Sequence, residues 1–207
     1  MDEQNMPYSF YVESTPNPAS LKFIANQTLL HAGASAQYNS SADCASAPLP
    51  KRLFEFPFVK YVFISSNYIT ITRHDMVEWY DIMSELRLFI TDYLNKGLPL
   101  IEQLPVQEVA VDSTFSETRK FYTEHDAPKT EVGVKVIEIL EDDMRPAVEQ
   151  DGGLISFKSF DNGKVTVQMK GSCSGCPSST VTLKSGIEGL LKRLMPDQVK
   201  EVVSESV

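Results

Sequence analysis

Cys173 and Cys176 are the residues of this chain whose types and spacing most clearly indicate chemistry. Two intervening residues let both sulfurs face one metal centre, and Gly171 and Gly175 permit a tight backbone whose amides can point at sulfur. A helix is predicted to begin directly after the pair, and the partial positive charge of a helix N-terminus favours thiolate. The spacing therefore predicts two thiolate ligands for a metal.

The number of ligands limits what the pair can hold. An iron–sulfur cluster or a structural zinc usually takes four ligands, and the chain offers one close pair. Cys44 belongs to another predicted unit and is interpreted as a free thiol, and the three histidines show no ligand spacing: His31, His74 and His125. A symmetric dimer in which each subunit gives two thiolates is the economical solution. Such a site opens when the subunits separate, which suits delivery better than storage.

Two other interpretations of Cys173 and Cys176 stay open at this point. An oxidoreductase could use the pair as a thiol–disulfide couple before a helix. The preceding elements are nevertheless predicted to be a helix and a hairpin rather than β-α-β, and no aromatic residue precedes Cys173. A zinc site shared by a dimer would use the same sulfurs to stabilise an interaction module. The interpretation as a dimer-shared cluster site predicts a carrier that is not an enzyme.

Composition excludes several classes of protein. The 207 residues suffice for one medium domain or two small ones, and the net charge of −9 is spread along the chain, which argues against a nucleic-acid partner. No apolar run approaches the roughly 20 residues that span a bilayer, so no membrane partner is expected. The first ten residues are acidic and resemble neither a secretory signal nor a transit peptide, which predicts a cytoplasmic protein.

Residues 1–97 are predicted to form a compact α/β domain. Its four expected strands are Tyr8–Glu13, Ser20–Ile24, Val59–Ile64 and Tyr68–Thr72. Residues 33–50 are small, polar and flanked by proline, and are predicted to be an exposed loop. A helix should follow the strand Tyr68–Thr72. Asp75 is expected to cap it, with Glu78 three residues on, and Gly97 is expected to end it. Its apolar face is expected to contain Trp79, Ile82, Met83, Leu86, Phe89 and Ile90.

Residues 98–130 have the weakest periodicity and are predicted to be a flexible linker, most polar from 113 to 129. Residues 131–207 are predicted to form a second small domain of the order helix–hairpin–helix–strand, with the cysteine loop before its second helix. The whole chain is therefore assigned to the α/β (α+β) class with two small domains.

The elements of the second domain follow from its pattern. Apolar residues from Val132 to Met144 have helical spacing, with Pro146 near the end of the helix. A turn over 150–153 precedes the hairpin, and a tight turn over 161–163 joins its two strands. The remaining elements are the hairpin strands Leu154–Phe160 and Lys164–Lys170, an amphipathic helix from Val181 to Leu194, and a short strand from Val199 to Val203.

Long runs around the cysteines closely resemble the NifU-like C-terminal, or Nfu-type, domain. They are the run from Met144 to Gly153, with Arg145-Pro146 and Asp151-Gly152-Gly153, and the run Gly171-Ser172-Cys173-Ser174-Gly175-Cys176-Pro177-Ser178 continuing to Glu188. This likeness covers roughly 132–203. The front of the chain resembles the Nfu N-terminal domain through 15–23, which reads TPNPASLKF, and through 59–72.

The resemblance implies an Nfu-type carrier of a [4Fe–4S] cluster. A [2Fe–2S] cluster is the alternative cargo. Cys173 and Cys176 carry over as the ligands, and the cluster would be bridged across a homodimer in the loaded form. It implies apo iron–sulfur proteins as recipients and upstream scaffold proteins as donors. One departure concerns Leu154, because the family usually has an acidic residue after the two glycines.

Overall fold

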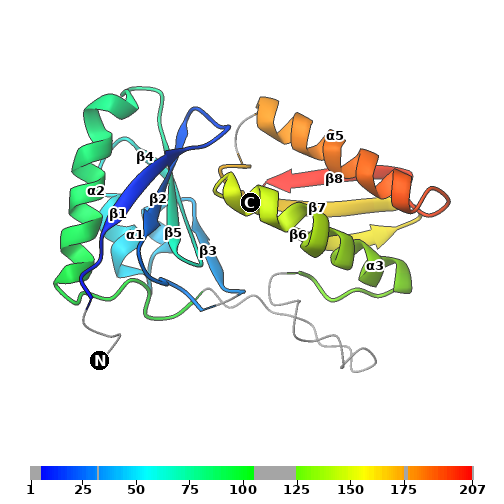
Figure 1. Cartoon of the computed structure of the whole chain (residues 1–207), viewed down its shortest axis with the longest axis horizontal. Coiled ribbons are helices and arrows are strands. Elements are labelled where there is room, and N and C mark those ends of the chain that lie inside the picture. The colour runs from blue at the N-terminus through cyan, green and yellow to red at the C-terminus, as the bar shows by residue number, and fades with distance from the viewer. Residues whose placement is uncertain (1–5, 32, 105–124, 175–176, 207) are drawn as a thin grey trace. The chain divides into compact units, whose positions relative to one another are not determined.

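The computed structural model describes residues 6–31, 33–104, 125–174 and 177–206, and the chain divides into two compact units, Met1–Pro105 and Val106–Val207. Each unit has helices packed on a β-sheet (Figure 1). This arrangement confirms the predicted α+β class. None of the helices in the described ranges combines the length and apolarity needed to cross a bilayer.

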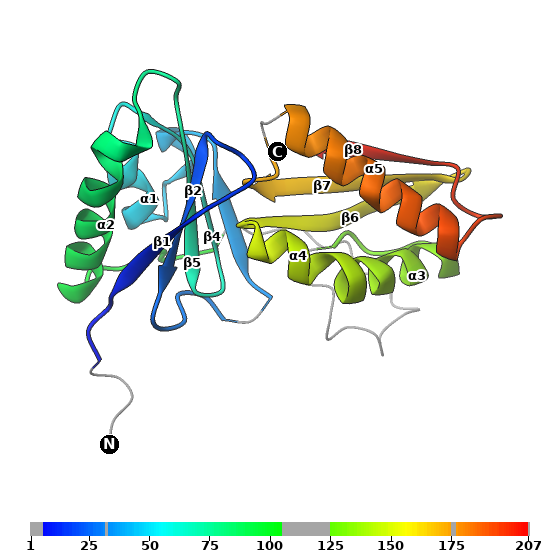
Figure 2. The same ribbon diagram turned by 45° about the horizontal axis from the view of Figure 1, so that its top comes forward.

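The first unit is a five-stranded antiparallel sheet in the order β1-β2-β5-β4-β3. Its helices α1 and α2 lie on one face of the sheet (Figure 2), and their apolar side chains join those of the strands in one core. The elements are β1 (Phe10–Ser14), β2 (Ser20–Ala25), β3 (Ser35–Tyr38), α1 (Pro48–Leu53), β4 (Val59–Ser65), β5 (Tyr68–Arg73) and α2 (Trp79–Asn95).

Helix α2 buries the face that its apolar spacing predicts, with Ile82, Leu86 and Ile90 in the core. The predicted cap is wrong. The N-cap is Glu78, and its side chain makes no capping hydrogen bond. The Trp79 indole N–H instead donates to the Pro18 carbonyl at 3.0 Å, so a contact with the turn between β1 and β2 fixes the start of α2.

The predicted exposed loop over residues 33–50 is wrong, because this segment contains β3, a 3₁₀ turn over Ser41–Asp43 and the start of α1. Strand β3 has four residues and pairs antiparallel with β4 at the edge of the sheet. Pro48 opens α1, where its fixed φ and missing N–H are tolerated. Tertiary pairing therefore organises a stretch whose own alternation covers only four residues.

Residues directly after α2 pack on the first unit. Leu100, Ile101 and Leu104 are partly buried against its core, and the Leu49 amide donates to the Leu100 carbonyl at 3.3 Å. Residues 105–124, which make up most of the predicted linker, lie outside the described residues. The linker limits at 98 and 130 therefore stay a prediction.

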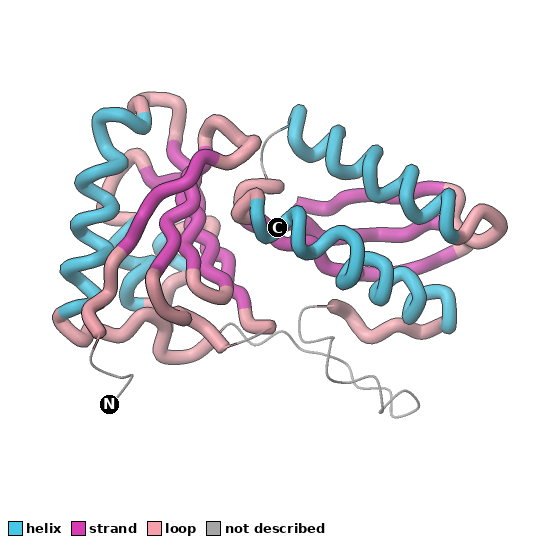
Figure 3. Tube along the Cα trace, in the orientation of Figure 1, coloured by secondary structure: helices cyan, strands magenta, loops and turns pink. Residues whose placement is uncertain are grey.

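The second unit is a three-stranded sheet in the order β6-β7-β8, with β6 and β7 antiparallel and β7 and β8 parallel. Its helices lie over one face of the strands (Figure 3) and share one core with them. The elements are α3 (Glu131–Ile139), a π-helical turn η4 (Leu140–Met144), α4 (Arg145–Gln150), β6 (Gly153–Asp161), β7 (Lys164–Gly171), α5 (Pro177–Leu194) and β8 (Glu201–Ser206).

The chain stays helical through Pro146, which the sequence placed near the helix end. A proline inside a helix has no N–H to donate and its ring crowds the preceding turn. The π-helical turn over Leu140–Met144 lies directly before it, and Pro146 then occupies the start of α4. The wider turn accommodates the proline without ending the helix.

Helix α5 buries Ile187 and Leu191 as its periodicity predicts, but Val181 and Leu194 are exposed. The predicted apolar face was therefore too wide at both ends of the helix. The predicted turns are confirmed: Asn162 and Gly163 have φ of 49° and 88° between β6 and β7, and Gly152 has φ of 77° before β6. These left-handed conformations suit asparagine and glycine.

Candidate functional site

Cys173 lies in the connection between the carboxyl end of β7 and the start of α5. Strand β7 ends at Gly171, whose φ of 68° turns the chain out of the sheet, and α5 begins at Pro177. Gly175 and Cys176 lie outside the described residues, so the pairing of Cys176 with Cys173 stays a prediction from the sequence. The described part of the loop places one predicted ligand between a strand and a helix N-terminus.

Hydrogen bonds fix the first half of this loop. The Ser174 amide and hydroxyl both donate to the Gly171 carbonyl, at 3.1 and 2.8 Å. The Ser172 amide donates to the Gly152 carbonyl at 3.2 Å, and its hydroxyl donates to the Asp151 carbonyl at 2.5 Å. The loop is therefore tied to itself and to the turn that precedes β6.

Gly153 leaves the space that the Cys173 side chain fills. A Cβ atom at this position would overlap the Cys173 sulfur and would lie 2.9 Å from the Lys170 carbonyl oxygen. Because the backbone of β7 cannot yield as a flexible side chain could, only glycine fits here without a shift. The turn at Asp151–Gly153, interpreted from sequence as chiefly a turn, also supports the cysteine loop.

Cys173 is 6% exposed and packs in the core of the second unit. Burial raises the pKa of its thiol to about 11, a hydrogen bond with Ser172 opposes this rise, and the charge of Asp151 adds to it. The thiol is therefore protonated at neutral pH in this form of the protein. A metal that binds its sulfur must displace a proton.

Cys44 is a free thiol, as interpreted from the sequence, but it is buried in the first unit rather than placed in an exposed loop. It is 1% exposed, packs with Ala36, Tyr38 and Ala47, and its thiol donates to the Ser40 carbonyl at 3.4 Å. Burial raises its pKa to about 11, and the charge of nearby Asp43 adds to the rise. The Cys44 side chain therefore contributes to the packing of the first unit.

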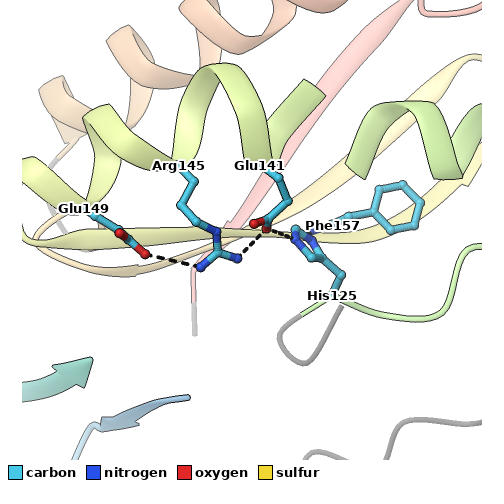
Figure 4. A network of polar contacts seen from close by, with 5 residues as sticks. All are labelled: His125, Glu141, Arg145, Glu149 and Phe157. Carbon is cyan, nitrogen blue, oxygen red and sulfur yellow. Dashed lines mark hydrogen bonds and ion pairs between the residues drawn. The ribbon is translucent and has the colours of Figure 1, made fainter. Parts of the chain in front are cut away.

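His125 is the polar residue whose role the sequence did not reveal. Its ring is fully buried, is hydrogen-bonded to the Glu141 carboxylate through Nε2, and accepts from the Phe157 amide through Nδ1 at 2.7 Å (Figure 4). Burial works to raise the pKa of Glu141, but hydrogen bonds from His125 and Arg145 outweigh it and lower the pKa overall. No spacing in a single sequence predicts contacts between residues 16 and 32 positions apart.

Fold and site together define a protein of two α+β units whose second unit carries a cysteine loop between a strand and a helix. Residues 10–97 match the family model described as the scaffold protein Nfu/NifU N-terminal domain, and residues 136–203 match the NifU-like domain. The chain belongs to the Nfu family.

Named relatives agree with this assignment. The chain is 37% identical over 196 residues to the NFU1 iron-sulfur cluster scaffold homolog, mitochondrial, of Drosophila willistoni, covering 94% of this chain and 63% of the relative. It is 36% identical over 205 residues to the NifU-like protein 5, mitochondrial, of Arabidopsis thaliana, covering 98% of this chain and 70% of the relative. The chain thus spans somewhat under two thirds of the fly relative's length.

The predicted cytoplasmic location is wrong, because these relatives, and NifU-like protein 4 of Arabidopsis thaliana, are named mitochondrial. The prediction rested on the acidic character of the first ten residues and on overall composition. Receptors read a protein's address from short targeting segments, so the composition of folded domains does not identify the compartment.

Proposed function

We propose that this chain carries an iron–sulfur cluster as cargo, bound through Cys173 and Cys176, and delivers it to apo iron–sulfur proteins. The observation that carries the proposal is the position of Cys173, on a loop between β7 and α5 that the glycine turn at Gly152 and Gly153 supports. Relatives named iron-sulfur cluster scaffold homologs support the identity of the cargo.

A homodimer follows from the ligand count. Each chain contributes two thiols with cluster spacing, whereas a [4Fe–4S] cluster takes four thiolates. Two copies related by a twofold axis would supply the four sulfurs from identical loops. A cluster that binds only the dimer shifts the monomer–dimer equilibrium toward the dimer, as any ligand shifts an equilibrium toward the state that it binds. Dimerisation would therefore depend on the cluster.

Burial of Cys173 favours release of the cargo. Its raised pKa means that the free thiol holds a proton, so each loading step costs the removal of that proton. When the thiolates of a recipient replace those of the carrier, Cys173 takes up a proton again and returns to its neutral, buried form. The carrier therefore holds its cargo less tightly than a recipient whose thiols have lower pKa values.

The same raised pKa disfavours the thiol–disulfide alternative. The attacking sulfur of a dithiol oxidoreductase is a thiolate, and its pKa is lowered toward or below neutrality in such enzymes. The pKa of Cys173 is shifted in the opposite direction, to about 11. A dimer-shared zinc site uses the same ligands as a cluster, and the experiment below separates the two.

The test is anaerobic reconstitution of the reduced protein with iron and sulfide, followed by native mass measurement and by iron and sulfide analysis of the same sample. We expect a brown dimer with broad absorption near ~400 nm and about four irons. About two irons per dimer would indicate [2Fe–2S] cargo. A colourless protein that releases zinc to a chelator, or a colourless dithiol that cycles with oxidant, would contradict the proposal, and a loaded monomer would exclude the bridging model.

A further inference from the structure

The sheet of the second unit has two edges, β6 and β8, because its strand order is β6-β7-β8. An edge strand presents outward N–H and C=O groups that can pair with a strand of another molecule. In both edge strands of this sheet, an ionisable side chain accepts a hydrogen bond from one outward amide.

On β6 the residue concerned is Phe157, next to the irregularity in pairing between Phe157 and Ser159. Its amide donates to His125 Nδ1 at 2.7 Å, and its carbonyl accepts from the Asp126 amide at 2.9 Å. His125 and Asp126 therefore provide the hydrogen-bonding groups of a neighbouring strand, with the imidazole in place of a carbonyl.

Polar contacts hold the His125 ring in the orientation that this role requires. Since Nδ1 accepts from Phe157, the ring proton is on Nε2, which donates to the Glu141 carboxylate. Arg145 donates to the same oxygen of Glu141 at 2.5 Å and to Glu149 at 3.3 Å (Figure 4). The acceptor nitrogen is thus positioned by a chain of three charged side chains along η4 and α4.

On β8 the residue concerned is Val202. Its amide donates to Glu188 Oε2 at 3.1 Å, while β8 pairs with β7 along its other side. Glu188 lies on α5, and its second oxygen accepts from Lys192 one helical turn later at 2.5 Å. The helix that packs on the sheet therefore reaches over its edge to occupy an outward amide.

We propose that His125 and Glu188 keep the two edges of this sheet from pairing with a strand of a second copy. On β8, Glu188 prevents antiparallel pairing of this strand with β8 of a second copy. Such pairing would bring the same residues of both copies together about a twofold axis. The proposal does not depend on the cargo, because neither hydrogen bond involves Cys173 or Cys176. It confines association of copies to surfaces other than the sheet edges.

The test compares variants of the full-length, reduced, metal-free protein in the presence of a chelator. Glu188→Ala removes the acceptor, Glu188→Gln keeps an acceptor oxygen with the same loss of charge, and Lys192→Ala removes only the ion pair. Alanine is the best helix former, so the first variant should fold, which circular dichroism checks. Sedimentation at matched concentrations then measures the dimer fraction.

We expect Glu188→Ala alone to increase the dimerisation constant, by roughly fivefold or more, the equivalent of one net hydrogen bond. Amide exchange should slow at Ser204, whose amide points outward like that of Val202 because strand residues alternate. An unchanged dimer fraction in Glu188→Ala, or an equal rise in Lys192→Ala, would overturn the proposal for β8. The β6 edge is tested independently by comparing His125→Ala with His125→Asn, which keeps an acceptor near the Nδ1 position. The readout is the rate of hydrogen exchange at the Phe157 amide.

Discussion

Gly153 and Cys173 are in direct contact across the start of β6 and the end of β7, and the glycine has no room for a side chain. The Lys170 carbonyl, 2.9 Å from where a Cβ would lie, blocks a backward shift. Any side chain at this position must therefore move the sulfur or spread the two strands. The relationship links the glycine turn to the ligand, although the two residues lie 20 positions apart.

Gly153→Ala should lower the free energy of unfolding by about 1–3 kcal/mol, because it overpacks a site with a rigid neighbour. It should also reduce the amount of iron bound, because the sulfur of Cys173 is displaced. Urea unfolding of the metal-free protein and iron analysis after reconstitution measure the two effects. Gly189→Ala is the matched control: a Cβ there meets nothing within 4 Å, and α5 should gain up to about 1 kcal/mol.

Cys173→Ala and Cys176→Ala should each abolish stable cluster binding, because the chain has one cysteine pair with cluster spacing. Cys44→Ala should still load fully, while losing about 1–2 kcal/mol of stability because its buried thiol packs and donates a hydrogen bond. Absorption near ~400 nm and thermal unfolding distinguish the two kinds of effect. A well-folded Cys44→Ala protein without iron would show that the ligand assignment is incomplete.

The Glu141 carboxylate should make stability depend on pH. Its folded pKa lies below the ordinary value of 4.5, so the unfolded chain binds the proton more tightly. The stabilisation is therefore present above about pH 4.5 and is lost as the pH falls through the lower, folded pKa. The stability difference between the parent and Glu141→Gln, from urea unfolding between pH 7 and pH 3, should shrink with acidification. A difference that is constant over this range would contradict the expectation.

Fragments of the second unit should differ according to whether they include His125 and Asp126. A fragment that begins at residue 130 should fold and load with iron, but it leaves the Phe157 amide and carbonyl without these partners. A fragment that begins at residue 124 keeps them and should be more stable by about 1–3 kcal/mol. Urea unfolding and iron analysis of both fragments provide the measurement. Equal stabilities would mean that the contacts at the β6 edge contribute nothing net.

Local sequence signals predicted the elements that depend on local physics. The turn at Asn162 and Gly163 requires left-handed backbone, which these residue types adopt at low cost, and the buried face of α2 follows the helical period. The strand β3 was not predicted, because an alternation of four residues is too short to indicate a strand, and its conformation depends on pairing with β4. The helical path through Pro146 likewise depends on a π-helical turn that no propensity scale contains.

At the site, the sequence identified the cysteine loop and the glycine turn as separate features. Their contact through Gly153 and the hydrogen bonds of Ser172 is a tertiary relationship that chain spacing does not encode. Sequence spacing tests His125 only as a ligand and does not reveal its contacts, because its partners Glu141 and Phe157 are distant in sequence. The predicted apolar face of α5 is too wide because Val181 and Leu194 have the right spacing but are exposed.

The parallel pairing of β7 with β8 means that the cysteine loop belongs to a crossover between two neighbouring strands. During synthesis on the ribosome both cysteines leave the exit tunnel before residues 201–206, which form β8. Until that strand docks, α5 lacks the sheet edge against which it is held, and the loop has only its β7 side anchored. An unfinished chain would therefore carry both thiols without a formed site, and truncation after residue 200 should reproduce this state as a protein that fails to retain iron.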